Sequence, residues 1–112
     1  MSAFVILIRE SEVTDEEALR SYRNVPDQAA ARPENLTVLA YYGAIEALEG
    51  EAPDGVVVFQ FPTVAAARDW YFSPQYQARV PLRRKAATYR GFIVEGIGAL
   101  GAGEAGQQED RR

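Results

Sequence analysis

The chain has 112 residues, no cysteine, no histidine and a net charge of −4. A single domain of this length buries enough apolar surface to fold without disulfides. The missing cysteines and histidines exclude thiolate nucleophiles, histidine or cysteine metal sites and a histidine ligand for haem. The acidic balance argues against nucleic acid as a partner, since phosphate binding needs concentrated positive charge. We therefore predict no metal and no cofactor.

The apolar runs of the sequence are short, whereas a membrane-spanning helix needs about 20 apolar residues. The N-terminal residues, MSA, lack the basic charge and the cleavage site of a signal peptide. We therefore expect a cytoplasmic protein without a membrane partner.

The first predicted elements are a strand and a helix. Residues 4–8 (FVILI) are apolar throughout, which is typical of a strand that is covered on both faces. Thr14 and Glu17 have the spacing of a capping box, in which side chains satisfy the free amides of a helix N-terminus. We expect a helix to begin there, to kink or restart at Pro26, and to extend toward Ala31.

Two further strands are predicted next. Residues 36–42 predict a second strand. Gly43 interrupts it, where we expect a bulge or a close backbone approach, and residues 44–48 could continue the strand. The Pro-Asp-Gly sequence at residues 53–55 is typical of a turn. Residues 56–61 (VVVFQF) are rich in β-branched and aromatic side chains and predict the central strand.

The second half predicts helices and a last strand. Thr63 is a good N-cap for a helix with an apolar stripe toward Trp70, and Ser73 followed by proline repeats the start signal. Residues 82–90 predict another helix, and residues 92–94 the last strand. From residue 98 onward the sequence has no apolar periodicity, so we expect a single domain over residues 1–97 and a disordered tail over 98–112.

The order strand, helix, strand, strand, helix, strand predicts an α+β fold, the ferredoxin-like split sheet with helices on one face. Several strands are apolar at both alternating sets of positions. One layer of helices covers only one set, so the other sheet face would be exposed. An apolar face of that size predicts a homodimer formed through the sheets.

Residues 56–97 resemble the family called domain of unknown function 1330, in the dimeric α/β-barrel superfamily. The resemblance extends over residues 4–97 and rests on four matches: W-Y-x-S-P-x-Y at Trp70, Tyr71, Ser73, Pro74 and Tyr76; L-R-R at residues 82–84; V-E-G at residues 94–96; and Leu48-Glu49-Gly50. The resemblance implies a ferredoxin-like protomer that dimerises through its sheets and has a cleft between sheet and helices. It implies no reaction.

Aromatic residues supply the first candidate site. Trp70, Tyr71 and Tyr76 could line a pocket for a small planar ligand, or they could instead anchor a helix and fill the core. Ser73 lies among them as a candidate ligand-binding residue and is also the expected helix cap. As a nucleophile it has no histidine to activate it.

Charged residues, with Tyr42, supply the second candidate site. Arg83 could hold a carboxylate or phosphate in bidentate geometry, or belong to a solvated basic helix face. Glu95 in the last strand is a candidate general base or the partner of an arginine such as Arg9. Tyr42 could donate a hydrogen bond to a carbonyl or enolate oxygen in the same cleft.

Three functions fit these residues. The first is a cofactor-independent enzyme, such as an isomerase or a monooxygenase-like protein, acting on a small carbonyl-bearing or aromatic acid. The second is a non-catalytic dimer that binds a small hydrophobic or anionic ligand. The third is a structural homodimer with a filled cleft. Whether the protein is an enzyme is left open by the sequence.

Overall fold

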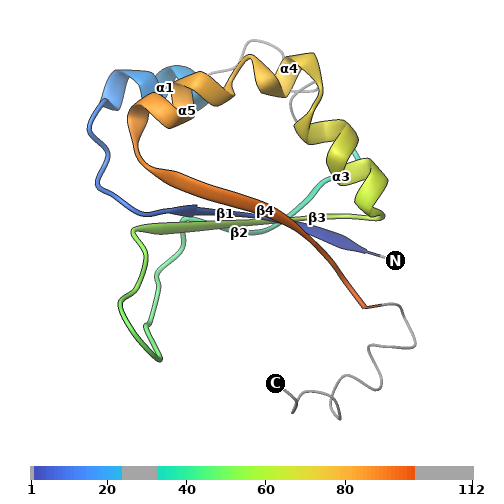
Figure 1. The fold of residues 1–112 in the computed structure, drawn as a ribbon, viewed down its shortest axis with the longest axis horizontal. Helices are drawn as coiled ribbons and strands as arrows, with labels where there is room; N and C mark the ends of the chain where they lie inside the picture. Colours follow the sequence, from blue (N-terminus) through green and yellow to red (C-terminus); the bar gives the residue numbers. More distant parts are fainter. Residues whose placement is uncertain (1, 24–32, 98–112) are drawn as a thin grey trace.

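The computed structural model describes residues 2–23 and 33–97. The elements in chain order are β1 Ala3–Arg9, α1 Glu16–Arg23, β2 Thr37–Tyr41, β3 Gly55–Phe61, α3 Val64–Tyr71, α4 Pro74–Gln77, α5 Val80–Ala86 and β4 Tyr89–Glu95. The strands form one antiparallel sheet in the order β2-β3-β1-β4, and the described helices arch over one face of it (Figure 1). The predicted ferredoxin-like α+β fold is confirmed, with an open sheet in the single chain. The expected kink at Pro26 and the expected tail from residue 98 lie outside the described residues.

The predicted start of the first helix is wrong by about one residue. The Asp15 carboxylate accepts a hydrogen bond from the Ala18 amide over 2.9 Å, so Asp15 caps α1. Thr14 instead makes two hydrogen bonds with the carbonyl oxygen of Ala86, through its amide at 2.8 Å and its hydroxyl at 3.3 Å. Thr14 therefore ties the start of α1 to the end of α5, a contact that the local sequence does not reveal.

The predicted bulge at Gly43 is also misplaced. The register between β2 and β3 shifts between Val38 and Ala40, and β2 ends at Tyr41. Tyr42 follows with a φ of 55°, the left-handed conformation that costs a side chain about 1 kcal/mol or more. Residues 44–48 form no strand. Tertiary contacts of Tyr42, described below, hold this conformation.

The boundary between the last helix and the last strand is a further correction. The predicted helix over residues 82–90 is α5, which begins earlier at Val80 and ends at Ala86. Ala87 is extended, with a φ of −166°, and Tyr89 already pairs with Arg9 of β1. The strand pairing with β1 overrides the helical spacing of Leu82, Ala86 and Tyr89 on which the longer helix was based.

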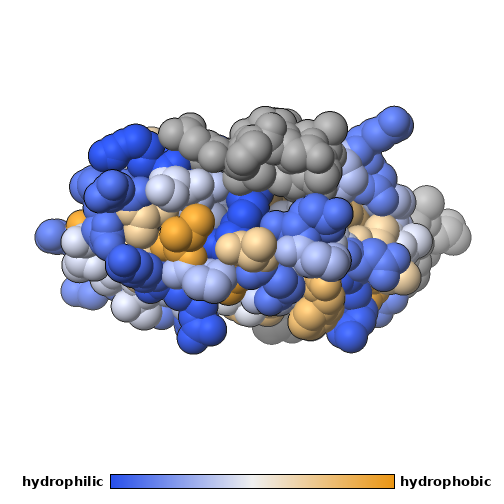
Figure 2. Space-filling view, turned by 90° about the horizontal axis from the view of Figure 1, so that it is seen from above, coloured by the Kyte–Doolittle hydropathy of each residue, from blue (hydrophilic) through white to orange (hydrophobic). Residues whose placement is uncertain are grey.

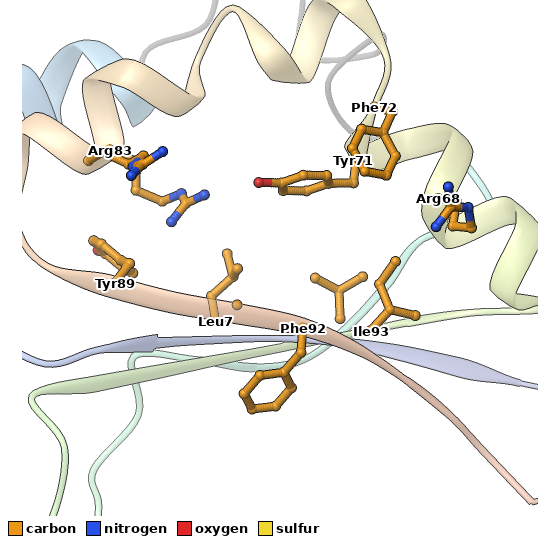
Figure 3. Close-up of a pocket in the computed structure, with 11 residues that line it drawn as sticks. Leu7, Arg68, Tyr71, Phe72, Arg83, Tyr89, Phe92 and Ile93 are labelled. Carbon is orange, nitrogen blue, oxygen red and sulfur yellow. The ribbon is translucent and has the colours of Figure 1, made fainter.

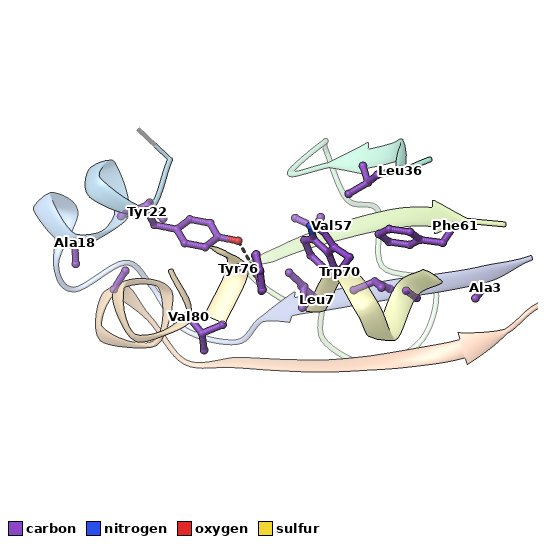
Figure 4. Close-up of a cluster of buried hydrophobic side chains, with 14 residues drawn as sticks. Ala3, Leu7, Ala18, Tyr22, Leu36, Val57, Phe61, Trp70, Tyr76 and Val80 are labelled. Atoms are coloured by element: carbon purple, nitrogen blue, oxygen red, sulfur yellow. Dashed lines mark hydrogen bonds between the residues drawn. The ribbon is translucent and has the colours of Figure 1, made fainter. Parts of the chain in front are cut away.

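The core lies between the sheet and the helices (Figure 4). Trp70 of α3 packs its indole against Phe61 of β3 at 5.5 Å and against Tyr76 of α4 at 4.2 Å between ring centroids. The Tyr76 and Tyr22 hydroxyls share a buried hydrogen bond of 2.9 Å. Burial, followed by the contact with Tyr76, raises the pKa of Tyr22 far above its usual value. This bond joins α1 to α4 across the core.

The two faces of the sheet differ. Seen from the helix side, the described surface is largely hydrophilic, with apolar residues in small separate areas (Figure 2). The opposite face, which we call the open face, has no described helix on it (Figure 1). By strand register it presents alternate residues of three strands, of which Gln60 and Arg90 are polar and the others apolar: Phe4, Ile6, Ile8, Val56, Val58, Phe92 and Val94. Phe92 is 40% exposed and Val94 is 43% exposed, so the predicted uncovered apolar face is present.

Candidate functional site

A cavity of about 410 Å³ lies between the sheet and helices α3 and α5 (Figure 3). Its position beside β4, an edge strand, brings it to the margin of the sheet. The size falls within the range of about 300–1,000 Å³ that is typical of small-molecule sites. The lining residues are Val5, Leu7, Arg68, Tyr71, Phe72, Arg83, Arg84, Tyr89, Gly91, Phe92 and Ile93.

The floor of the cavity is apolar and comes from β1 and β4. Val5 pairs with Ile93 and Leu7 pairs with Gly91 in the strand register, which puts these side chains on one face. Gly91 has no side chain to fill the space: an added Cβ would lie 2.7 Å from Leu7 Cδ2. The Phe92 ring points to the other side of the sheet (Figure 3). A substituent at residue 91 would therefore narrow the cavity directly.

Arg83 lies above this floor. Val80, Arg83 and Ala86 recur at helical spacing on the buried face of α5, so an arginine occupies a position that a core residue would normally take. Arg83 is 4% exposed. Its guanidinium lies 5.0 Å from the centre of the Tyr89 ring. Its Nε is buried without a hydrogen-bond partner, and neither of the ion pairs among the described residues includes it.

The neighbourhood of Arg83 is electropositive. Burial disfavours its charge, but Tyr76 and Tyr22 more than offset this and raise the pKa of Arg83 further, so the guanidinium stays cationic. Arg68 and Arg84 also line the cavity, and no aspartate or glutamate is among the described residues that do. The Tyr71 hydroxyl points from α3 toward Arg83 (Figure 3). A cationic cavity in a chain of net charge −4 favours an anionic ligand.

The aromatic candidates divide between cavity and core. Tyr71 is half-buried and lines the cavity, whereas Trp70 and Tyr76 are buried within the core cluster. Ser73 caps α4: its hydroxyl accepts from the Tyr76 amide at 3.2 Å and donates to the Trp70 carbonyl at 2.7 Å. Trp70 and Ser73 also border a second cavity of about 280 Å³ with Pro33, Asn35, Ala66 and Asp69. Of the predicted aromatic cluster, Tyr71 lines this cavity, and Tyr76 contacts the Arg83 side chain from within the core.

Tyr42 lies at the far end of β2 and contacts β4 rather than the cavity. Its hydroxyl is 2.6 Å from that of Tyr89, and the Arg9 guanidinium lies 5.2 Å from the centre of its ring. Burial, followed by the bond to Tyr89, raises the pKa of Tyr42 far above its usual value. Tyr42 thus stays protonated, and it lies behind Tyr89, the lining residue to which it is bonded.

Glu95 lies at the opposite end of β4 from Tyr89 and is exposed. The two are six positions apart along the strand, a distance of about 20 Å. Arg9 pairs with Tyr89 and donates to the Asp54 carbonyl at 3.1 Å, so it too is distant from Glu95. Glu95 is therefore far from Tyr89 and from the Tyr42 hydroxyl bonded to it, and it is not among the residues that line the cavity with Tyr71 and Arg83. Its catalytic role stays a prediction.

The sequence did not indicate the floor of this cavity or the contribution of Tyr89 to its lining. The sequence predicts Leu7 and Ile93 in strands, Tyr89 in a helix and Gly91 between helix and strand, and it gives none of them a functional role, because only the strand register brings them beneath α5. One signal was available for Arg83, since its spacing from Val80 and Ala86 predicts an inward position. Over the described ranges, no group of histidine, cysteine, aspartate or glutamate residues could hold a metal ion, and no helix is long and apolar enough to cross a membrane.

Comparison with known families decides the classification. The model of the family described as domain of unknown function (DUF1330) matches residues 2–97. This chain belongs to the DUF1330 family. The match covers every described element of the fold and all the described residues that line the cavity. No curated protein matches the DUF1330 chain.

Solved structures with the same fold share little sequence with this DUF1330 protein. A protein of unknown function from Rhodopseudomonas palustris is 19% identical over 87% of this chain and 83% of its own, with a TM-score of 0.60. A dimeric ferredoxin-like protein of unknown function from Thermobifida fusca is 14% identical over 86% and 92%, with a TM-score of 0.58. An EthD family protein from Bacillus halodurans is 13% identical over 87% and 100%, with a TM-score of 0.55. These similarities establish the fold alone.

Proposed function

We propose that this DUF1330 protein is a homodimer whose protomers each bind a small anionic, aromatic or carbonyl-bearing molecule between the sheet and the helices. The observation that carries the proposal is the cavity of about 410 Å³ with the cation of Arg83 buried in its wall. Small-molecule sites combine an apolar lining with a few fixed polar groups. A purely structural protein would fill this space.

The composition of the lining supports binding over proton-transfer catalysis. Among the described lining residues, tyrosines and arginines are the titratable groups, and neither type is a good base near neutral pH. Glu95, the carboxylate expected to serve as base, is exposed at the other end of β4. The non-catalytic reading therefore takes precedence, and an isomerase or monooxygenase-like activity is the alternative to test.

The ligand proposal is tested by a thermal-shift screen of small anionic, neutral and cationic organic compounds, followed by calorimetry on the full chain. We expect compounds that raise the melting temperature to bind at least about tenfold more weakly to Gly91→Leu, which fills the cavity, and to Gly91→Ala, which narrows it. Ala65→Leu, an exposed change on α3, should bind as the wild type does. Hits whose affinity is the same for the wild type and for both Gly91 variants would overturn the proposal, and so would a screen without hits.

Turnover of each hit is then followed by mass spectrometry to separate binder from enzyme. Binding without conversion supports the non-catalytic reading. Conversion that Glu95→Gln abolishes, with binding retained, would instead assign the enzymatic function and give Glu95 the role of base.

The dimer proposal rests on the apolar open face, and two structural neighbours are described as dimeric. Phe92 and Val94 are the exposed apolar residues that β4 contributes to this face. We expect sedimentation equilibrium to give a dimer for the wild type and a folded monomer for Phe92→Glu with Val94→Glu, because two carboxylates cannot be buried there unpaired. Ala65→Glu on the helix side is the control and should stay dimeric. A monomeric wild type would contradict this proposal.

A further inference from the structure

The charge of Arg83 is buried without an anion among the described residues. Burying an ionised group costs several kcal/mol unless it is paired and hydrogen-bonded. The contact with the Tyr89 ring, at 5.0 Å, and a hydrogen bond with the Tyr76 side chain offset part of this cost. Among the described residues, the Nε donor has no hydrogen-bond partner. A buried donor of this kind, 4% exposed and in the wall of a cavity, has the properties of half of an ion pair.

The geometry of the donors selects a planar anion with two oxygens. A guanidinium presents its N–H groups as a fixed fork, which pairs with the two oxygens of a carboxylate through parallel hydrogen bonds. Tyr71 directs its hydroxyl toward the same place from α3 (Figure 3). A carboxylate beside Nε would thus satisfy the free donor and also reach the tyrosine hydroxyl.

The remaining charges favour one negative charge rather than several. Arg68 and Arg84 line the cavity but are exposed, so water already solvates them. Arg68 also stacks on the Phe72 ring at 5.2 Å. Only Arg83 brings a desolvated positive charge, and a single anionic group neutralises it.

The rest of the ligand must be apolar. The floor beneath Arg83 consists of Val5, Leu7 and Ile93, and these side chains offer no hydrogen bonds. A polar body placed there would lose its hydration without compensation. The Tyr71 ring gives an aromatic surface above the same floor (Figure 3).

We infer that the natural ligand is an organic monocarboxylate, with its carboxylate on Arg83 and its apolar body between Tyr71 and the floor formed by Val5, Leu7 and Ile93. This inference rests on the proposed ligand-binding function and gives its site a substrate class. It also defines the orientation of the ligand in the cavity: the acid group lies toward α5 and the apolar body toward β1 and β4.

The test compares matched probes by calorimetry on the full chain. Benzoate and hexanoate carry the acid on an aromatic and an aliphatic body, benzamide and hexanamide are their neutral counterparts, and inorganic phosphate is an anion without an apolar body. Each is titrated into wild type, Arg83→Met and Arg20→Met. Arg20 is exposed on α1, away from the cavity lining, so its variant controls for the loss of one positive charge.

We expect at least one acid to bind about tenfold or more tightly than its amide, and Arg83→Met to remove that preference while Arg20→Met keeps it. A preference for benzoate over hexanoate would assign the aromatic body, and the reverse the aliphatic one. Equal binding of acids and amides, or binding of neutral library compounds but of no acid, would overturn the monocarboxylate and leave the ligand site standing. Phosphate binding as tightly as the acids would overturn the apolar body. If neither these probes nor any library compound binds, the proposed function fails as well.

Discussion

The hydroxyl oxygens of Tyr42 and Tyr89 lie 2.6 Å apart and link the two edges of the sheet. Tyr42 follows β2 and Tyr89 begins β4, and β3 and β1 lie between these strands. The Tyr42 ring passes over Gly55 of β3, where an added Cβ would come within 2.7 Å of it. The same Tyr89 ring supports the guanidinium of Arg83. The left-handed backbone of Tyr42 is thus held by a hydrogen bond that also positions a wall of the cavity.

Removal of either hydroxyl should weaken the fold. Tyr42→Phe and Tyr89→Phe each leave one half-buried oxygen without its partner, and we expect each to lower the free energy of unfolding by about 1–2 kcal/mol in urea denaturation. The double variant should lose little more than either single variant, because both remove the same bond. Fully additive losses would show that the two hydroxyls do not interact.

The protein should lose stability in alkali. The pKa values of Tyr22 and Tyr42 are raised in the folded chain, chiefly by burial, whereas an unfolded tyrosine ionises near pH 10. Above that pH the unfolded chain releases protons that the folded chain keeps, so unfolding becomes easier by up to about 2.7 kcal/mol per pH unit for two such groups. Denaturation midpoints measured from pH 8 to pH 11.5 should be level at first and then fall. Tyr22→Phe should roughly halve the slope, and an unchanged slope would contradict this assignment.

Arg83→Met should not harm the fold in the absence of ligand. The substitution removes a buried cation that has no carboxylate partner among the described residues and keeps most of the side-chain volume, a change that is often neutral or stabilising by about 1 kcal/mol or more. We expect the melting temperature of the free protein to hold or rise. A loss above about 2 kcal/mol would mean that Arg83 supports the structure, and would remove the reason to regard it as a ligand anchor.

Ser73→Ala separates the capping role from a role in binding. Loss of the cap on α4 should cost about 1 kcal/mol of stability. Ser73 is outside the cavity lining, so affinity for any ligand of that cavity should change less than twofold at a temperature where both proteins are folded. Ser73→Asp, which can also cap, should recover stability. A tenfold loss of affinity would instead return Ser73 to the site.

The sequence carried enough local information for the sheet and its helices. The structure contains each element predicted from the apolar runs at residues 4–8 and 56–61 and from the capping residues Thr63 and Ser73. Errors arose where a distant contact decides a boundary. Thr14 binds the end of α5 instead of capping α1, and Tyr89 joins β1 instead of extending a helix.

The candidate site was predictable only in part. Tyr71 and Arg83 come from one continuous stretch of motif, and they do face the same cavity. Part of its floor comes from β1, far from that stretch in sequence, and its open volume depends on Gly91 lying opposite Leu7. No local pattern specifies such a pairing, because it follows from the antiparallel register. The position of Glu95, by contrast, follows from the length of β4.

Strand β4 contributes Ile93 to the floor of the cavity and Phe92 to the open face. Neighbouring residues of a rigid strand face opposite ways, so any shift of β4 that makes room for a bulky guest carries the Phe92 ring across the other surface by the same distance. In the proposed dimer, a second protomer packed against that ring would therefore limit how wide the cavity can become. The size of the ligand that the cavity accepts and the strength of the contact between protomers would then be linked through β4.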